Sequence, residues 1–172
     1  MTNKKIVFIG MMGSGKTTIA RLLAEKLNLA FFDMDKIFTQ KFNISISEFF
    51  KEFGEEKFRN EETNILKQAL VNDNFVLSCG GGVILKKENR DLIFKEDITT
   101  IFLKANPETI YNRTKSDTSR PLLMVENPKK EIEHILKKRE EFYNLAKIII
   151  QTDDKTINEI TEEIFSKLCQ TY

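Results

Sequence analysis

Five short apolar runs, each continuous rather than alternating in polarity, constrain the fold of this chain more than any other feature. They occupy residues 6–9, 30–32, 75–77, 98–103 and 147–150. Continuous apolar strands of this length are typical of a parallel sheet that is buried on both faces. Stretches with helical periodicity lie between and after them, at residues 16–27, 55–71, 86–94, 106–113, 128–145 and 156–168. The alternation predicts an α/β fold of three layers, with a parallel five-stranded sheet and helices on both faces.

Length and composition limit the remaining possibilities. With 172 residues, the chain is expected to form one domain over residues 1–172 with its own core. Its 27 Lys and Arg residues and 26 Asp and Glu residues give a formal net charge of +1, without the basic excess typical of a nucleic-acid binder. No apolar run approaches the ~20 residues of a membrane span, and Cys79, Cys169 and His134 are too few for a disulfide framework or a zinc site. We therefore expect a cytoplasmic monomer that binds neither nucleic acid nor a membrane.

A glycine-rich segment directly follows the first predicted strand and directly precedes the first predicted helix. Residues 10–17 read Gly-Met-Met-Gly-Ser-Gly-Lys-Thr and match the phosphate-binding pattern G-x-x-x-x-G-K-[ST] in the context that this pattern requires. In such a loop, backbone N–H groups and the helix N-terminus surround phosphate oxygens. Lys16 would reach the outer phosphates, and Thr17 would offer a hydroxyl to Mg²⁺. A glycine-rich turn with a surface lysine is the alternative, but the context favours a purine nucleoside triphosphate with Mg²⁺ as the ligand.

Two charged residues fall on the apolar side of the predicted helix 55–71. At about 100° per residue, Arg59 and Glu62 lie within the arc that apolar residues such as Phe58 and Ile65 define. An ordinary surface pair three residues apart is one interpretation. Burial of charges is costly unless they have partners, however, so their position favours residues that line a polar cavity.

The predicted helix 128–145 repeats this pattern with Arg139. The Arg139 side chain falls on the same face as Ile132, whereas His134 points away among charged residues and is expected to be solvated. Two arginines from different helices suit a carboxylate or phosphate ligand held bidentately. An internal salt bridge is the alternative for Arg139, as it is for Arg59.

Aspartate and glycine residues close the second and third predicted strands. Asp33 and Asp35 end the second strand, where carboxylates two residues apart can reach a metal and a substrate or can cap a helix, and spacing alone favours neither interpretation. Residues 80–82 are three glycines after the third strand, which bring backbone N–H groups against a neighbour that leaves no room for a Cβ atom. Cys79 beside them has no base nearby in the sequence, so we expect a small buried side chain rather than a nucleophile.

These segments together resemble the shikimate kinase family, and the resemblance extends over essentially the whole chain. The motifs that carry it are the loop 10–17, Asp33-Met34-Asp35, Phe58-Arg59 with Glu62, Gly80-Gly81-Gly82, Arg120-Pro121-Leu122-Leu123, and Arg139 with Tyr143. Their shared order along the chain is more specific than any single motif. The resemblance implies a P-loop kinase fold with a mobile lid, of the nucleoside monophosphate kinase-like group. It also implies ATP-dependent phosphorylation of the 3-hydroxyl of shikimate, a step of aromatic amino-acid biosynthesis.

The family resemblance further implies roles for individual residues. ATP would contact Gly13, Ser14, Gly15, Lys16, Thr17, Thr18, Arg113 and Arg120. Shikimate would contact Asp35, Arg59, Gly80, Gly81, Gly82 and Arg139, in a pocket walled by Phe50 and Phe58. Mg²⁺ would lie near Thr17 and Asp33, because the third strand ends without the aspartate that many P-loop enzymes have there. The catalytic residues would be Lys16, Arg120, and Asp35 as a binder and candidate base.

The resemblance also divides the domain into parts. It implies a shikimate-binding helical region at about residues 34–62 and a lid at about residues 114–126 that carries Arg120. Arg113 and the loop 151–155 would flank adenine.

Two rival functions share these features. Another small-molecule kinase of the same architecture, acting on gluconate or a nucleoside monophosphate, would have the same phosphate loop. A nucleotide-dependent switch is favoured only by Thr114-Lys115-Ser116-Asp117, which resembles the guanine-reading N-K-x-D of GTPases. That segment begins with threonine and lies in a predicted loop rather than at a strand end, so we interpret the similarity as coincidence.

Overall fold

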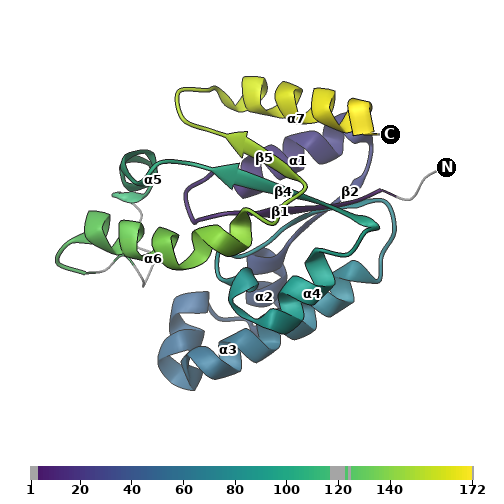
Figure 1. The fold of residues 1–172 in the computed structure, drawn as a ribbon. Coiled ribbons are helices and arrows are strands. Elements are labelled where there is room, and N and C mark those ends of the chain that lie inside the picture. The colour runs from purple at the N-terminus through teal and green to yellow at the C-terminus, as the bar shows by residue number, and fades with distance from the viewer. Residues whose placement is uncertain (1–3, 117–122, 124, 172) are drawn as a thin grey trace.

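A parallel five-stranded sheet with helices on both faces forms the centre of the molecule, as the sequence predicts (Figure 1). The computed structural model describes residues 4–116, 123 and 125–171. The strands are β1 (Lys5–Ile9), β2 (Ala30–Asp33), β3 (Phe75–Ser78), β4 (Ile98–Lys104) and β5 (Ile148–Gln151). Their order across the sheet is β2-β3-β1-β4-β5, and every neighbouring pair is parallel. The carboxyl ends of all five strands therefore lie at one end of the sheet, on the left in Figure 1.

Seven α-helices and one short 3₁₀ helix, η1, lie between and after the strands within the described residues. They are α1 (Lys16–Leu27), α2 (Met34–Phe42), α3 (Ile46–Leu70), η1 (Val83–Leu85), α4 (Lys87–Ile93), α5 (Pro107–Thr114), α6 (Pro128–Tyr143) and α7 (Ile157–Thr171). The loop after α5 and before α6 holds most of the residues outside the described part of the chain.

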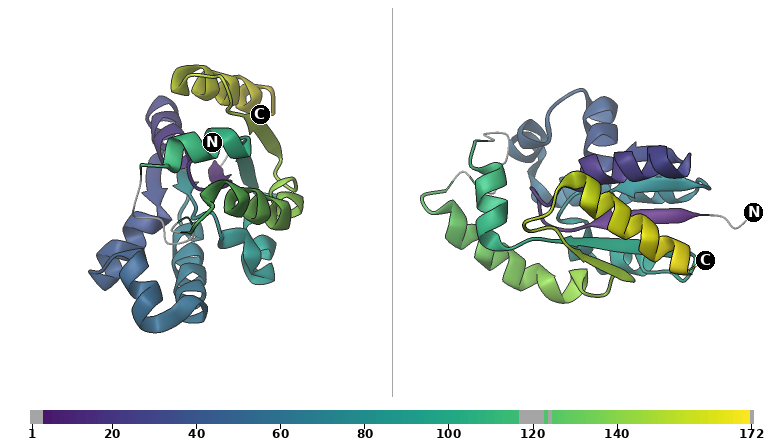
Figure 2. Two further views of the ribbon diagram at one scale, coloured as in Figure 1. Left: turned by 90° about the vertical axis from the view of Figure 1, so that its left-hand side faces the viewer. Right: turned by 90° about the horizontal axis from the view of Figure 1, so that it is seen from above.

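Two hydrophobic clusters join the sheet to its helical layers. On one face, α1 and α7 pack against the sheet through residues such as Leu23 and Ile164, which belong to one buried cluster with Phe8. On the other face, α2, α3 and α4 lie with α6, and their apolar side chains pack with Val7 and Leu77. Figure 2 shows α1 and α7 on one side of the sheet and α3 on the other. A third, smaller cluster joins α5 and α6 to the loop after β1.

The central strands are buried on both faces, but the edge strands are not. All residues of β3 are buried, and residues 6–9 of β1 are fully buried. In β5, by contrast, Ile148 and Ile150 are buried while Ile149 is 40% exposed. The expectation that all five runs are covered on both faces is therefore wrong at the edges of the sheet. The alternating burial of β5 shows that the helices leave one face of this strand uncovered.

Residues 34–54, to which the apolar pattern assigned no helix, are mostly helical. The helix α2 begins where the Asp33 carboxylate accepts hydrogen bonds from the backbone N–H groups of Asp35 and Lys36, at 3.0 and 3.2 Å. The helix α3 begins with a capping box, in which Ser45 and Glu48 each bond the other's backbone N–H group. Both caps are signals readable in the sequence, and they determine these two helix starts.

Gly54 divides α3 into two helical halves. Its φ of 79° and ψ of 169° lie in a region that is essentially restricted to glycine, and a Cβ built on it meets no atom within 4 Å. The kink therefore arises from the backbone and not from crowding. The second half begins at Glu55, the residue at which the sequence predicts the helix to start.

Replacement of Gly54 by alanine is expected to lower the free energy of unfolding by about 1–3 kcal/mol, since alanine is strained at this φ and ψ even though its methyl group has room. Denaturant unfolding of Gly54→Ala beside Glu52→Ala, an exposed position in the first half of the helix, measures the difference. Equal stability of the two variants would contradict a strained backbone at residue 54.

Candidate active site

The loop between β1 and α1 has the backbone geometry of an anion cradle. Gly13 and Gly15 have φ angles of 76° and 96°, and a Cβ on Gly13 would lie 2.6 Å from Thr114 Cγ2. The helix α1 begins after Gly15 without a side-chain cap, so its first N–H groups are available to a ligand. The buried Ser14 Oγ has no hydrogen-bond partner within the described part of the chain. These features fit the predicted phosphate loop.

Lys16 and Thr17 lie at the start of α1, as the motif requires. Lys16 is 8% exposed, and its Nζ donates to the Met11 carbonyl oxygen at 3.0 Å across the loop. The Thr17 hydroxyl donates to Asp33 Oδ2 at 2.7 Å and lies 3.4 Å from Ser78 Oγ. The ends of β2 and β3 therefore bring polar groups to the first turn of α1. The Ser78 contact was not predicted, although the position of Ser78 at a strand end is a usable signal.

Thr17 and Asp33 supply oxygen ligands of the type that Mg²⁺ prefers. No group of three or more His, Cys, Asp or Glu residues within the described ranges could hold a metal ion. The two side chains fit an ion that takes its remaining ligands from nucleotide phosphates and water, which is the usual way that proteins bind Mg²⁺ in nucleotide sites.

The two aspartates after β2 have different surroundings. Asp33 is buried, and it caps α2 through Oδ1 while Oδ2 accepts from Thr17, so it serves both as a helix cap and as a polar group of the site. Asp35 is exposed in the first turn of α2 and faces Gly80, since a Cβ built on Gly80 would lie 3.2 Å from Asp35 Oδ1. The same Cβ would lie 3.0 Å from Glu62 Oε1. Asp35 and Glu62 therefore both lie close to Gly80.

Arg59 and Glu62 form a buried pair on α3, which excludes the surface-pair interpretation. They are 9% and 4% exposed, and Arg59 Nη1 donates to Glu62 Oε2 at 2.8 Å. Burial raises the pKa of Glu62, and the charge of Arg59 opposes that rise. The Arg59 guanidinium lies 5.1 Å from the ring centroid of Phe58 and 5.9 Å from that of Phe50. The two phenylalanines expected to wall the pocket thus flank the arginine.

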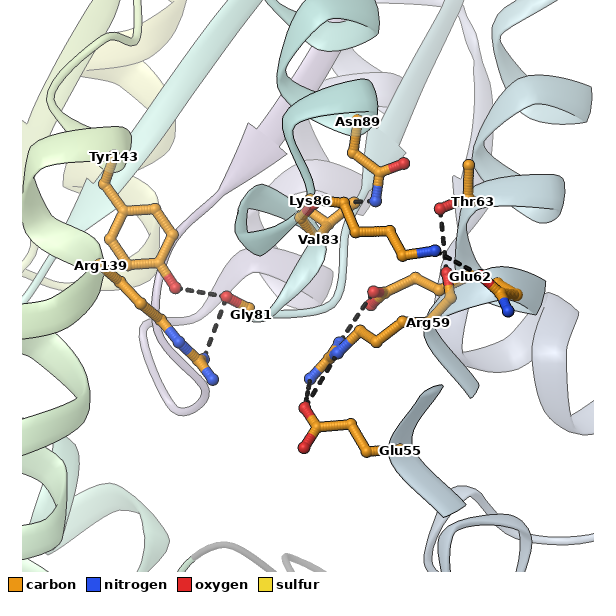
Figure 3. Close-up of polar contacts among 11 residues, drawn as sticks. Glu55, Arg59, Glu62, Thr63, Gly81, Val83, Lys86, Asn89, Arg139 and Tyr143 are labelled. Atoms are coloured by element: carbon orange, nitrogen blue, oxygen red, sulfur yellow. Dashed lines mark hydrogen bonds and ion pairs between the residues drawn. The ribbon is translucent and has the colours of Figure 1, made fainter. Parts of the chain in front are cut away.

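A third charged residue, Glu55, joins this pair and was not anticipated. Its Oε1 accepts from both Nε and Nη2 of Arg59, each at 3.3 Å, and 61% of its side chain is exposed (Figure 3). The spacing of four residues between Glu55 and Arg59 on one helix could have indicated this contact.

The three glycines after β3 allow their neighbours to approach closely. A Cβ on Gly82 would lie 2.6 Å from Cζ of Arg59, which is far inside contact distance. A Cβ on Gly81 would lie 3.3 Å from the Gly10 oxygen and from the Met12 nitrogen in the phosphate loop. The glycine segment therefore packs between the phosphate loop and the arginine of α3.

Arg139 and Tyr143 reach the same segment from α6. Arg139 Nη1 and the Tyr143 hydroxyl both donate to the Gly81 carbonyl oxygen, at 3.2 and 2.5 Å (Figure 3). Burial raises the pKa of Tyr143 to about 12, so the phenol keeps its proton for this bond. Arg139 is 6% exposed and forms no salt bridge with any residue that the structure describes, which removes the main support for the internal salt-bridge interpretation. In Figure 3 the guanidinium groups of Arg139 and Arg59 point toward the same space.

The remaining predicted residues lie at the periphery of this centre. Arg113 donates to the hydroxyl and carbonyl oxygens of Thr152 at 3.2 and 2.9 Å, which brings together the two segments expected at adenine. Arg120 and most of the predicted lid lie outside the described residues. Thr114, expected to open that lid, is instead the buried last residue of α5, because its hydroxyl donates to the Ile110 carbonyl oxygen. Thr114 therefore does not lie at a strand end, where a guanine-reading motif would be.

Two further residues have the surroundings that the sequence predicts. Cys79 is buried, and burial raises the pKa of its thiol well above the usual range, which does not suit a nucleophile. His134 is exposed on α6, away from the site.

Comparisons with known proteins agree with this geometry. The chain matches the shikimate kinase family over residues 12–169. It is 39% identical over 164 residues to a shikimate kinase of Thermodesulfovibrio yellowstonii, with 95% of this chain and 94% of the relative covered. It is 41% identical over 155 residues to a shikimate kinase of Neisseria gonorrhoeae, with 90% and 87% covered.

Solved structures give the same result. The structure of an Acinetobacter baumannii shikimate kinase in complex with shikimate has a TM-score of 0.94 and 33% identity, with 99% of this chain and 95% of that chain covered. A gluconokinase of Sinorhizobium meliloti has a TM-score of 0.62 at 18% identity, which is a likeness of fold alone. The match along the chain and the match in structure lead to one conclusion: this protein belongs to the shikimate kinase family.

Proposed function

We propose that this protein transfers the γ-phosphate of ATP to the 3-hydroxyl of shikimate, forming shikimate 3-phosphate in the cytoplasmic pathway to aromatic amino acids. The observation that carries the proposal is the position of Arg59 and Arg139, two buried arginines from different helices, beside a glycine segment that touches the phosphate loop. Such an arrangement suits a small acid with one carboxylate and several hydroxyls.

At the phosphate end, the first turn of α1 and the loop before it would bind ATP. Backbone N–H groups of Gly13, Ser14 and Gly15 and the side chains of Lys16, Thr17 and Thr18 would surround the phosphates. Mg²⁺ bound near Thr17 and Asp33 would neutralise charge on the phosphates. Lys16 would exchange its bond to the Met11 carbonyl oxygen for one to a phosphate oxygen, since its amino group already lies in the loop.

At the acceptor end, Arg59 and Arg139 would hold the shikimate carboxylate, and Asp35 with the N–H groups of residues 80–82 would hold its hydroxyls. Asp35 would also accept the proton of the reacting hydroxyl, because it is an exposed carboxylate close to Gly80 and two residues from Asp33. The chemistry of such a transfer is mainly positioning and charge stabilisation, so the distance between the two ends decides the rate.

Arg113 and Arg120 complete the proposed nucleotide site. Arg113, tied to Thr152, would flank adenine, and Arg120 would approach the transferring phosphate from the lid. An arginine that reaches the phosphate only in the closed state stabilises the transition state more than the ground state.

The enzyme is proposed to act as a monomer. Among the residues described, no helix combines the length and apolar character required to cross a membrane.

An assay of ADP release tests the reaction and the phosphate site together. The wild-type protein is expected to release ADP slowly from ATP without shikimate and rapidly when shikimate is added. Lys16→Ala should lose at least ~10²-fold in kcat, because it lacks a preorganised positive group at the phosphates. Lys26→Ala is the matched control, since Lys26 lies on the same helix but pairs with Glu162 at the surface. Near-normal turnover by a folded Lys16→Ala variant would refute the phosphate-site assignment.

Calorimetry tests the proposed carboxylate site. Arg139→Leu is expected to weaken shikimate binding by ~2–5 kcal/mol, because one partner of a buried charge pair is lost, and to change ATP binding little. Lys138→Leu, the exposed neighbour on α6, should leave both affinities unchanged. An unaltered shikimate affinity in Arg139→Leu would make this arginine a structural residue that only holds Gly81.

Asparagine variants separate the roles of the two aspartates. Asp33→Asn keeps a good cap for α2, so the fold should persist, and its lowered kcat should recover in part with added Mg²⁺. Asp35→Asn removes the proton acceptor, so its kcat should fall without recovery. The measurement is kcat against Mg²⁺ concentration, and recovery of Asp35→Asn alone would reverse the two assignments.

A further inference from the structure

Arg59 is held by two carboxylates that differ in burial. The side chain of Glu62 is 5% exposed and its oxygen lies 2.8 Å from Nη1, whereas the side chain of Glu55 is 61% exposed and its Oε1 lies 3.3 Å from both Nε and Nη2. Glu62 is thus a fixed partner inside the protein. Glu55 is a longer, solvent-facing partner of the same guanidinium.

Glu55 occupies the part of Arg59 that a ligand carboxylate would use. A guanidinium binds a carboxylate through two N–H groups on one edge. Glu55 contacts the edge formed by Nε and Nη2, and Glu62 contacts Nη1. The edge formed by Nε and Nη2 is therefore fully engaged by Glu55. A ligand carboxylate that binds bidentately at this edge must displace Glu55.

We propose that Glu55 is a displaceable internal counter-ion, which holds Arg59 in the empty site and releases it to the carboxylate of shikimate. This inference rests on the proposed function, since it assumes that the acceptor's carboxylate binds at Arg59. Glu55 acts through Arg59 and is therefore a positioning residue.

Burial assigns the displacement to Glu55 rather than to Glu62. The Glu55 side chain is 61% exposed, so it can turn further into solvent. Glu62 lies in mid-helix and is buried, and release of its charge there would be costly. The rings of Phe50 and Phe58 remain beside the guanidinium after Glu55 departs.

Charge balance supports the same assignment. In the empty site, Glu55 and Glu62 both pair with the single positive charge of Arg59. A ligand carboxylate bound at Arg59 would be a third negative charge around one guanidinium unless one glutamate moves away. Departure of Glu55 restores the balance, and an uncharged ligand provides no electrostatic reason for it to leave. The exchange would thus favour acceptors that carry a carboxylate.

The test compares shikimate binding by wild-type protein and Glu55→Gln in calorimetry. Removal of the competing charge is expected to lower the dissociation constant for shikimate roughly two- to five-fold, the range that a partly exposed ion pair can supply. The KM for shikimate should fall in parallel while kcat stays unchanged, because Glu55 does not touch the reacting atoms. Glu56→Gln is the matched control: it removes the same charge from the adjacent exposed position, and within the described chain Glu56 makes no ion pair.

The methyl ester of shikimate supplies a second measurement. It lacks the charge that would displace Glu55, so its affinity, measured by competition with shikimate, should be equal in wild-type and Glu55→Gln. Weaker shikimate binding in Glu55→Gln would mean that Glu55 instead orders Arg59 for the ligand, and unchanged binding would make Glu55 a bystander. Either result overturns the inference but leaves the proposed function intact. Absence of shikimate binding by the wild-type protein would overturn the proposed function itself.

Discussion

The carbonyl oxygen of Gly81 is the contact on which the arrangement of the site depends. It accepts hydrogen bonds from Arg139 and Tyr143 of α6, while the α-carbon on the same residue lies against the phosphate loop, so that an added Cβ would be 3.3 Å from the Gly10 oxygen. Because residues 80–82 carry no side chains, three parts of the molecule approach one backbone segment. The spacing between the phosphate end and the acceptor end is thereby set by backbone packing, which is less compliant than contacts between long side chains.

Buried charge is the second constraint on this site. Arg59, Glu62 and Arg139 are all under 10% exposed, and unpaired charges at such depth are strongly unfavourable. The protein offsets Arg59 with Glu62 and Glu55, and it gives Arg139 a carbonyl oxygen instead of a carboxylate. Arg139 therefore retains charge that a ligand can neutralise. The site is stable when empty and still attractive to an anion.

Asp33 illustrates how one residue can satisfy two interpretations of a sequence pattern. Spacing left a helix cap and a polar site residue equally open, and the structure contains both, since the two carboxylate oxygens point to different partners. The cap fixes the side chain in one orientation. The oxygen that faces Thr17 is consequently preorganised, and Thr17 itself is fixed by its place in the first turn of α1.

The sequence alone determined the alternation of the five strands with most of the helices, the phosphate loop and the presence of charges on apolar helix faces, because these follow from periodicity and local motifs. Periodicity missed α2 and the first half of α3. The sequence did not show that β5 is half exposed, that Glu55 shares Arg59 with Glu62, or that Arg139 and Tyr143 converge on Gly81. The last contacts join residues 58 and 62 positions apart. Only the tertiary structure decides such pairings, since they depend on how two helices pack on the sheet, whereas a local pattern depends on neighbours along the chain.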